Sequence, residues 1–117
     1  MNKLFKSQRV CKRAHYSEVL SSEGKVVFRN ILLKFKPHTA GDMRLGLVVS
    51  KKVGCAVVRN KVKRLLRESF RQLPAPTRAK SFDIVVIARH SAKFANYASL
   101  SKQLQSGVTR VLARKSL

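Results

Sequence analysis

Four cationic side chains and one amide recur at helical spacing within the segment 59–71, RNKVKRLLRESFR. At 100° per residue they fall within an arc of about 100° on one side of the predicted helix. These residues are Asn60, Lys63, Arg64, Arg67 and Arg71. Such side chains bind phosphate, and the planar fork of arginine can hold two phosphate oxygens at once. Like charges four residues apart on a helix repel each other and destabilise it, and binding to a row of phosphates would offset this repulsion. Taken alone, however, a cationic stripe on a helix is more often a face exposed to solvent.

The segment before this helix adds a second group of cations. Lys51 and Lys52 lie in a predicted basic loop around Gly54, and the loop leads directly to the N-terminal end of the helix. That end of a helix presents free N–H groups and a partial positive charge to its neighbour. The two loop lysines could therefore share one anion-rich ligand with Arg59 and Asn60.

Residue types that support hydrolysis are scattered along the chain. A protein nuclease needs metal-binding carboxylates or an acid–base pair. The available residues are Glu18, Glu23, Asp42, Glu68, Asp83, His15, His38 and His90. They form no close motif, so we predict no catalytic residue and no metal site on the protein. A ribonuclease site of two histidines and a lysine, brought together only by folding, is the weaker alternative. Cys11 and Cys55 lack metal-ligand spacing and are predicted to be reduced thiols of a cytoplasmic protein.

The charge of the whole chain agrees with phosphate chemistry. Among 117 residues there are 26 Lys and Arg against 5 Asp and Glu, a formal charge of +21, while 44% of the residues are apolar. A chain of this length can bury a core, but so high a charge opposes compaction and favours a polyanion as partner. An anionic membrane is the weaker candidate, because no stretch approaches the ~20 apolar residues of a spanning helix. Residues 1–10 do not resemble a signal peptide.

Apolar periodicity predicts the elements that position these cations. In chain order they are a helix over 13–22, strands over 25–36 and 45–50, a helix over 57–73, a strand over 82–88 and a helix that begins near Asn96. The stretch 25–50 can hold two or three strands, and Gly46 suggests a bulge or a close backbone approach. This order predicts an α+β sandwich in a single domain, 1–117, in which residues 1–12 form a basic N-terminal arm.

Each predicted element has an apolar side for a core. In the helix over 57–73 this side is formed by Val62, Leu65, Leu66, Ser69, Phe70 and Leu73. The last helix carries Leu100, Leu104, Val108, Val111 and Leu112, interrupted by Gly107. Val27, Ile31, Leu33 and Phe35 are predicted to share one face of the first strand. The strand over 82–88, FDIVVIA, is nearly all apolar, which predicts burial on both faces.

The run 46–68, GLVVSKKVGCAVVRNKVKRLLRE, resembles the signature of the bacterial ribonuclease P protein family. The family's RNR motif falls on residues 59–61, here RNK, where Lys61 keeps the charge of the usual arginine but loses its fork. The resemblance extends along nearly the whole chain. Residues 12–16, KRAHY, are similar to the start of the family's first helix, with tyrosine where phenylalanine is usual, and 83–89, DIVVIAR, are similar to its last strand.

The resemblance implies a two-layer α/β sandwich of order α-β-β-β-α-β-α, related to a ribosomal-protein domain, with a left-handed crossover between parallel strands. It also implies two RNA-contacting surfaces: the basic helix with its loop for a catalytic RNA, and a cleft between the first helix and the sheet for the leader of precursor tRNA. The first set is Lys51, Lys52, Arg59, Asn60, Lys61, Lys63, Arg64 and Arg67, to which the helical stripe adds Arg71. The second is Lys12, Tyr16, Leu20 and Phe35, of which Tyr16 and Leu20 could instead be core residues of the first helix.

Membership in this family would make the chain the protein subunit of an endoribonuclease that removes the 5′ leader of precursor tRNA, with the active site carried by RNA. We then expect Mg²⁺ to be required by the ribonucleoprotein, with no cofactor held by the protein. The expected partners are the catalytic RNA and precursor tRNA, without a membrane or an obligatory protein partner. A structural ribosomal protein, a helix-turn-helix DNA-binding protein and a stand-alone nuclease remain as alternatives. The predicted strand over 82–88 argues against the second, because that module is usually all helical.

Overall fold

The structure, a computed structural model, describes residues 25–37, 43–74, 77 and 82–116 of the 117-residue chain. The predicted N-terminal arm and the predicted helix over 13–22 lie outside the described residues. Cys11, Lys12, Tyr16 and Leu20 also lie outside them.

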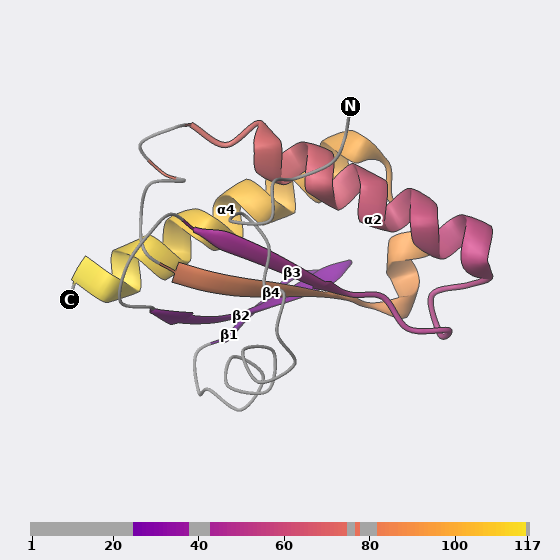
Figure 1. The fold of residues 1–117 in the computed structure, drawn as a ribbon, viewed down its shortest axis with the longest axis horizontal. Helices are drawn as coiled ribbons and strands as arrows, with labels where there is room; N and C mark the ends of the chain where they lie inside the picture. The colour runs from indigo at the N-terminus through magenta and orange to yellow at the C-terminus, as the bar shows by residue number, and fades with distance from the viewer. Residues whose placement is uncertain (1–24, 38–42, 75–76, 78–81, 117) are drawn as a thin grey trace.

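A four-stranded sheet forms one layer of the molecule (Figure 1). Its strands, in spatial order, are β1 (Lys25–Val27), β2 (Ile31–Pro37), β4 (Phe82–Ala88) and β3 (Arg44–Val48). β2 is antiparallel to both β1 and β4, whereas β3 is parallel to β4. The predicted strand over 82–88 is confirmed. It lies between two partners and is buried along nearly its whole length, which is why its sequence is almost continuously apolar.

The prediction of one strand over 25–36 is wrong, because a turn at residues 28–30 divides it into two paired strands. The N–H of Phe28 donates to the carbonyl of Ile31 at 2.8 Å and closes the turn. The turn changes which side chains face the core: Val26 is buried, whereas Val27 is 47% exposed instead of sharing the face of Ile31. The stretch 25–50 therefore holds three strands. The pairing of β3 runs without interruption through Gly46, so the suggested bulge is absent from this strand.

The described helices cover one face of this sheet (Figure 1). They are α2 (Ala56–Arg71), the short 3₁₀ helix η2 (His90–Phe94) and α4 (Tyr97–Ser116). The core lies between the two layers. It contains Ile31 and Leu33 from β2, Ile84 and Val86 from β4, Leu66 and Phe70 from α2, and Leu100, Leu104 and Val108 from α4. A two-layer α/β sandwich is therefore confirmed.

The ends of both long helices follow from local chemistry. α2 ends at Arg71, two residues before the predicted end, and Gln72 caps it ahead of Pro74. The side chain of Asn96 accepts a hydrogen bond from the N–H of Ser99 at 2.8 Å, which confirms it as the N-cap of α4. Gly107 allows α4 to approach the sheet closely, since a Cβ there would lie 2.8 Å from a methyl group of Leu33. None of the helices in the described part of the chain is long and apolar enough to span a membrane.

Candidate nucleic-acid interface

The loop between β3 and α2 is held in a compact turn. The N–H of Val53 donates to the carbonyl of Ser50 at 3.0 Å, and the N–H of Gly54 donates to that of Lys51 at 3.2 Å. Val53 is fully buried, while Lys51 and Lys52 are exposed. Gly54 has a φ of +155°, and a Cβ there would lie 3.0 Å from the side chain of Val58. A buried anchor and a glycine-dependent turn thus fix the two lysines at the start of α2.

The buried side of α2 determines which side chains face solvent. Val62, Leu66, Ser69 and Phe70 are buried, which confirms most of the predicted apolar side. Leu65, the other residue of the predicted apolar side that lies within the helix, is only partly buried. Ser69 adds no unpaired polar group to the core, because its hydroxyl donates to the carbonyl of Leu65 at 2.9 Å. The opposite side of the helix is thereby fixed toward solvent.

The cations of α2 gather on that outward side at two depths. Asn60, Lys61 and Arg64 are exposed, and Arg59, Lys63, Arg67 and Arg71 are half-buried. Half-burial lets a long side chain lay its aliphatic stem on the protein while its charged end reaches solvent. The structure therefore brings together, on one helix and its leading loop, the set predicted to contact the catalytic RNA. Their role in binding stays a prediction.

Arg59 has an unusual environment within this set. Its side chain is half-buried, but the Nε atom is buried without a hydrogen-bond partner in the described part of the chain. A buried donor without an acceptor costs about 1–3 kcal/mol. An acceptor that drew this guanidinium outward would remove that cost.

Few carboxylates lie among the residues that the structure describes. In the described ranges the acidic residues are Glu68 and Asp83. Asp83 is 6% exposed and is held by Arg44 through two hydrogen bonds, of 2.6 Å from Nε and 2.7 Å from a terminal nitrogen. Glu68 lies on α2 and forms no ion pair within the part of the chain that the structure describes. The one carboxylate within α2 therefore leaves most of the positive charge of this helix uncompensated by the helix itself.

The start of α2 favours an anion. Cys55 precedes the helix in an extended conformation, is exposed, and makes no capping hydrogen bond with its side chain. The backbone N–H of Val58, then that of Val57, lowers the pKa of the Cys55 thiol, and the charge of Arg59 acts in the same direction. The first turn of α2 contains no acidic residue. The same N–H groups and charge would stabilise a phosphate at this end of the helix.

The residues of the predicted leader cleft are not brought together in the described part. Lys12, Tyr16 and Leu20 lie outside it. Phe35 is half-buried on the core side of β2 and packs edge-to-face on Phe82, with 6.2 Å between the ring centroids and 70° between the rings. Its assignment to the cleft stays a prediction. Among the described residues there is also no cluster of His, Cys, Asp and Glu that could hold a metal ion.

Sequence reasoning missed one aromatic neighbour of the cationic helix. Tyr97, the first residue of α4, lines a cavity of about 360 Å³ together with Arg64, Leu65 and Glu68 of α2. Tyr97 as a whole residue is 36% exposed. Aromatic residues beside arginine are common where unpaired bases bind. Tyr97 lies 33 positions after Arg64 in the sequence, so only the packing of α4 on α2 brings the two residues together.

Comparison with known proteins gives a consistent result. The family model described as Ribonuclease P matches residues 4–112. The ribonuclease P protein component of Dehalococcoides mccartyi is 36% identical over 110 residues, covering 92% of this chain and 89% of that protein. The corresponding protein of Shouchella clausii is 38% identical over 101 residues, covering 86% and 82%.

Solved structures show the same fold. The RNase P protein of Staphylococcus aureus superposes with a TM-score of 0.79 at 31% identity, covering 91% of this chain and 96% of that one. The RNase P protein of Thermotoga maritima gives a TM-score of 0.74 at 28% identity, with 84% and 92% covered.

The sheet, its helical layer and the cationic side of α2 define a class of small, basic α+β proteins suited to a polyanionic partner. Within that class the matches are specific, because they span most of both chains. The chain belongs to the ribonuclease P protein component family.

Proposed function

We propose that this chain is the protein subunit of ribonuclease P and binds the catalytic RNA through the outward side of α2 and the loop before it. The observation that carries the proposal is the arrangement of α2. Its apolar side is buried in the core, its cations lie on the side toward solvent, and Glu68, the one carboxylate of this helix, forms no ion pair among the described residues. Family membership supplies the identity of the polyanion. The predicted contacts are Lys51, Lys52, Arg59, Asn60, Lys61, Lys63, Arg64, Arg67 and Arg71.

The protein would act by lowering the electrostatic cost of bringing two RNAs together. Each phosphate neutralised by a lysine or arginine releases counterions, which adds about 0.7–0.9 to the slope of log K against log salt. A protein that supplies this charge reduces the concentration of Mg²⁺ needed for the same screening. We therefore propose that the Mg²⁺ requirement belongs to the ribonucleoprotein and falls when the protein is added.

The cutting step would be carried by RNA. In support, Asp83 is engaged by Arg44, and no group of three or more His, Cys, Asp and Glu among the described residues could hold a metal ion. The reaction would be endonucleolytic removal of the 5′ leader of precursor tRNA. We place it in the cytoplasm, without an obligatory protein partner.

The leader would bind a second surface, formed by Lys12, Tyr16, Leu20 and Phe35. Stacking of an unpaired base on the Tyr16 ring would supply about 1–3 kcal/mol. Phe35 could take part only if the leader reaches the edge of its pair with Phe82, because the rest of its ring packs on the core.

The test is cleavage of a labelled precursor tRNA at low Mg²⁺, with the protein and the catalytic RNA of the same genome added separately and together. Correct 5′ maturation only in the presence of both supports the proposal. Cleavage by the protein alone would show that an active site on the protein was missed. Tight RNA binding without stimulation would favour a structural ribosomal protein instead.

A further inference from the structure

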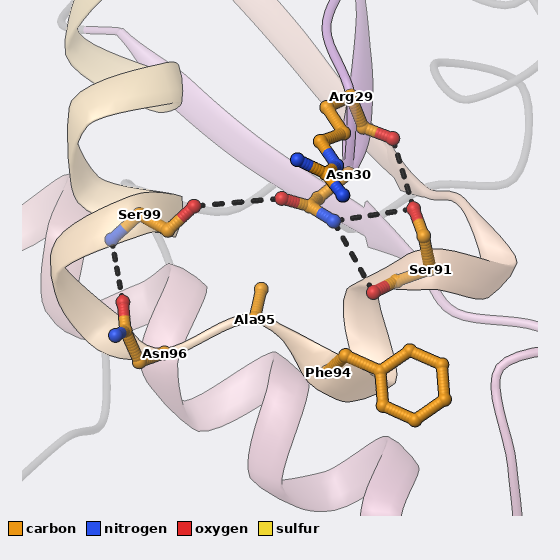
Figure 2. A pocket seen from close by; sticks show the side chains of 7 residues that line it. All are labelled: Arg29, Asn30, Ser91, Phe94, Ala95, Asn96 and Ser99. Atoms are coloured by element: carbon orange, nitrogen blue, oxygen red, sulfur yellow. Dashed lines mark hydrogen bonds between the residues drawn. The ribbon is translucent and has the colours of Figure 1, made fainter.

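A second pocket, lined mainly by polar residues, lies at the end of the sheet where the loop between β3 and α2 begins. Its volume is about 330 Å³, and it is lined by Arg29, Asn30, Ser91, Phe94, Ala95, Asn96 and Ser99 (Figure 2). These residues come from the turn between β1 and β2, from η2 and from the start of α4. Ile31 pairs with Ala88, and Val48 pairs with Ile87. The turn, η2 and the loop after β3 therefore lie at the same end of the sheet, as Figure 1 also shows.

The wall of this pocket is rigid because Asn30 joins its three segments. Asn30 is 6% exposed, and its amide nitrogen donates to the carbonyl of Ser91 at 3.2 Å and to its hydroxyl at 3.1 Å. The Asn30 side-chain oxygen accepts from the amide of Gln103 at 2.7 Å and from the hydroxyl of Ser99 at 3.5 Å. Figure 2 shows this side chain between Ser99 and Ser91. Every donor and acceptor of the Asn30 amide is thus used by the protein, so this residue shapes the pocket without binding a ligand.

The rim of the pocket carries the aromatic ring of Phe94, which is not part of the hydrophobic core. Phe94 is 82% exposed, more than any other large apolar side chain in the described ranges. The ammonium group of Lys93 lies 5.0 Å from the centre of its ring. This cation covers part of the ring and leaves most of it open to solvent. A ring held at a pocket rim beside a cation is a platform on which an unpaired base can stack.

The groups left free at this pocket are hydrogen-bond donors. The guanidinium of Arg29 makes no hydrogen bond or ion pair with the described residues. The oxygen of Asn96 accepts the capping bond from Ser99, which leaves its amide nitrogen for a ligand. The lining contains no carboxylate. Donors of this kind match the acceptor oxygens of a phosphate and of the bases.

From this geometry we propose that the pocket binds one unpaired nucleotide of RNA. Its base stacks on Phe94, and its phosphate or base oxygens accept hydrogen bonds from Arg29 and Asn96. The inference rests on the RNA-binding role proposed above. An RNA that follows the basic loop onto α2 would pass the same end of the sheet, which makes the pocket a continuation of that surface. A peptide partner is a poorer match, because the open face combines a single ring with positive charge that no carboxylate of the pocket lining compensates.

The nucleotide can come from the catalytic RNA or from precursor tRNA, and three binding measurements separate the two sources. The first is the affinity of the protein for the catalytic RNA alone. The second and third are the affinities of the assembled ribonucleoprotein for precursor tRNA and for the same tRNA without its leader. A loss in the first measurement assigns the nucleotide to the catalytic RNA. A loss for precursor tRNA but not for leaderless tRNA assigns it to the leader.

Phe94→Ala and Arg29→Ala are the informative variants, because both side chains lie outside the core. We expect each variant to weaken one of these affinities by about 10-fold. This is the effect expected from the loss of one base-stacking contact or one charged hydrogen bond. Arg29→Ala should also reduce the salt slope by about 1, whereas Phe94→Ala should leave the slope unchanged. Lys102→Ala, which removes one exposed cation of α4 away from the pocket lining, serves as the charge control and should change the affinity by less than about 2-fold.

A spectroscopic readout places the contact directly. The chain contains no tryptophan, so Phe94→Trp introduces a single indole at the rim and keeps an aromatic platform. Binding of RNA should quench the tryptophan fluorescence of the Phe94→Trp variant, and the affinity of this variant for RNA should match that of the unmodified protein. In the control variant Ala113→Trp, whose tryptophan lies on the exposed side of α4, RNA should not quench the fluorescence. Unchanged affinities for both pocket variants, with no quenching of Phe94→Trp, would overturn the inference while leaving the proposed function intact. Failure of the unmodified protein to bind catalytic RNA would instead remove the proposed function.

Discussion

α2 and α4 pack on the same face of the sheet, yet their outer sides differ. Both helices bury an apolar stripe at similar spacing, with Leu66 and Phe70 on α2 and Leu104 and Val108 on α4 at 1% exposure or less. The outer side of α2 carries six lysines and arginines together with Val57, Asn60 and Glu68. Over residues 98–113, the outer side of α4 mixes Lys102 and Arg110 with serine, glutamine and threonine. Burial therefore explains the inner side of both helices. Burial of the inner side does not require the cations on the outer side of α2, which is why we propose that they bind RNA.

The largest effect should come from the inner side of α2. Leu66→Ala removes a fully buried side chain and leaves a cavity in the core. We expect it to lower the free energy of unfolding by about 2–5 kcal/mol. Denaturant unfolding measures this directly, and Lys61→Ala on the exposed side of the same helix is the control, expected to change stability by less than about 0.5 kcal/mol. Equal losses for the two variants would contradict the division of α2 into an inner and an outer side.

The outer sides of the two helices can be compared with a matched pair of double variants. Arg64→Ala with Arg67→Ala removes two cations from α2, and Lys102→Ala with Arg110→Ala removes two from α4. We expect the α2 pair to weaken affinity for the catalytic RNA by about 10- to 100-fold and the α4 pair by less than about 3-fold. Binding at fixed salt measures both. A comparable loss for the α4 pair would mean that only total charge matters.

The turn that presents Lys51 and Lys52 can be tested at Gly54. Its φ of +155° and the 3.0 Å approach to Val58 make a side chain costly there. Gly54→Ala should lower the free energy of unfolding by about 1–3 kcal/mol. RNA affinity measured where the variant is still folded should also fall, because the lysines lose their fixed position. A stable variant with unchanged affinity would show that the loop geometry is unimportant.

A titration of the Cys55 thiol reports on the start of α2. Because the N–H groups of Val58 and Val57 and the charge of Arg59 lower its pKa, the thiolate should form below the pH usual for cysteine. In a Cys11→Ser background, the alkylation rate should reach its midpoint at this lower pH. Bound RNA would place phosphate charge nearby and move the midpoint up. An unchanged midpoint on RNA binding would argue against phosphates at this end of α2.

The smallest effect concerns the third residue of the RNK motif. Lys61 is exposed at the first turns of α2 and presents a single ammonium group where the related pattern has an arginine fork. Lys61→Arg should leave stability unchanged. If residue 61 contacts a phosphate, affinity for the catalytic RNA should rise by about 2- to 5-fold. Lys61→Gln is the control and should lower it.

The spacing of apolar residues within a segment was sufficient to predict the helices and strands whose stability depends on apolar burial. The strand over 82–88 and the two sides of α2 follow directly from residue types, because burial imposes a period on the sequence. The turn at 28–30 could not be predicted in the same way. It contains no glycine or proline, and the hydrogen bonds that hold Asn30 come from Ser91 and Gln103, at least 61 positions away.

The candidate site shows the same division. The cations of α2 were predictable because they share one helix. The approach of Tyr97 to Arg64, and the pocket formed by Arg29, Asn30 and Phe94, depend on how separate elements pack. Periodicity within a segment carries no information on such contacts. These tertiary arrangements therefore had to come from the structure.

The most direct test of the account is the salt dependence of binding to the catalytic RNA, measured for the unmodified protein and for the two double variants. Removing Arg64 and Arg67 from α2 should reduce the slope of log K against log salt by about 1.4–1.8, because two phosphate contacts are lost. Removing Lys102 and Arg110 from α4 should leave the slope unchanged. Equal reductions in the two variants would contradict the claim that the outer side of α2 is the RNA-binding surface.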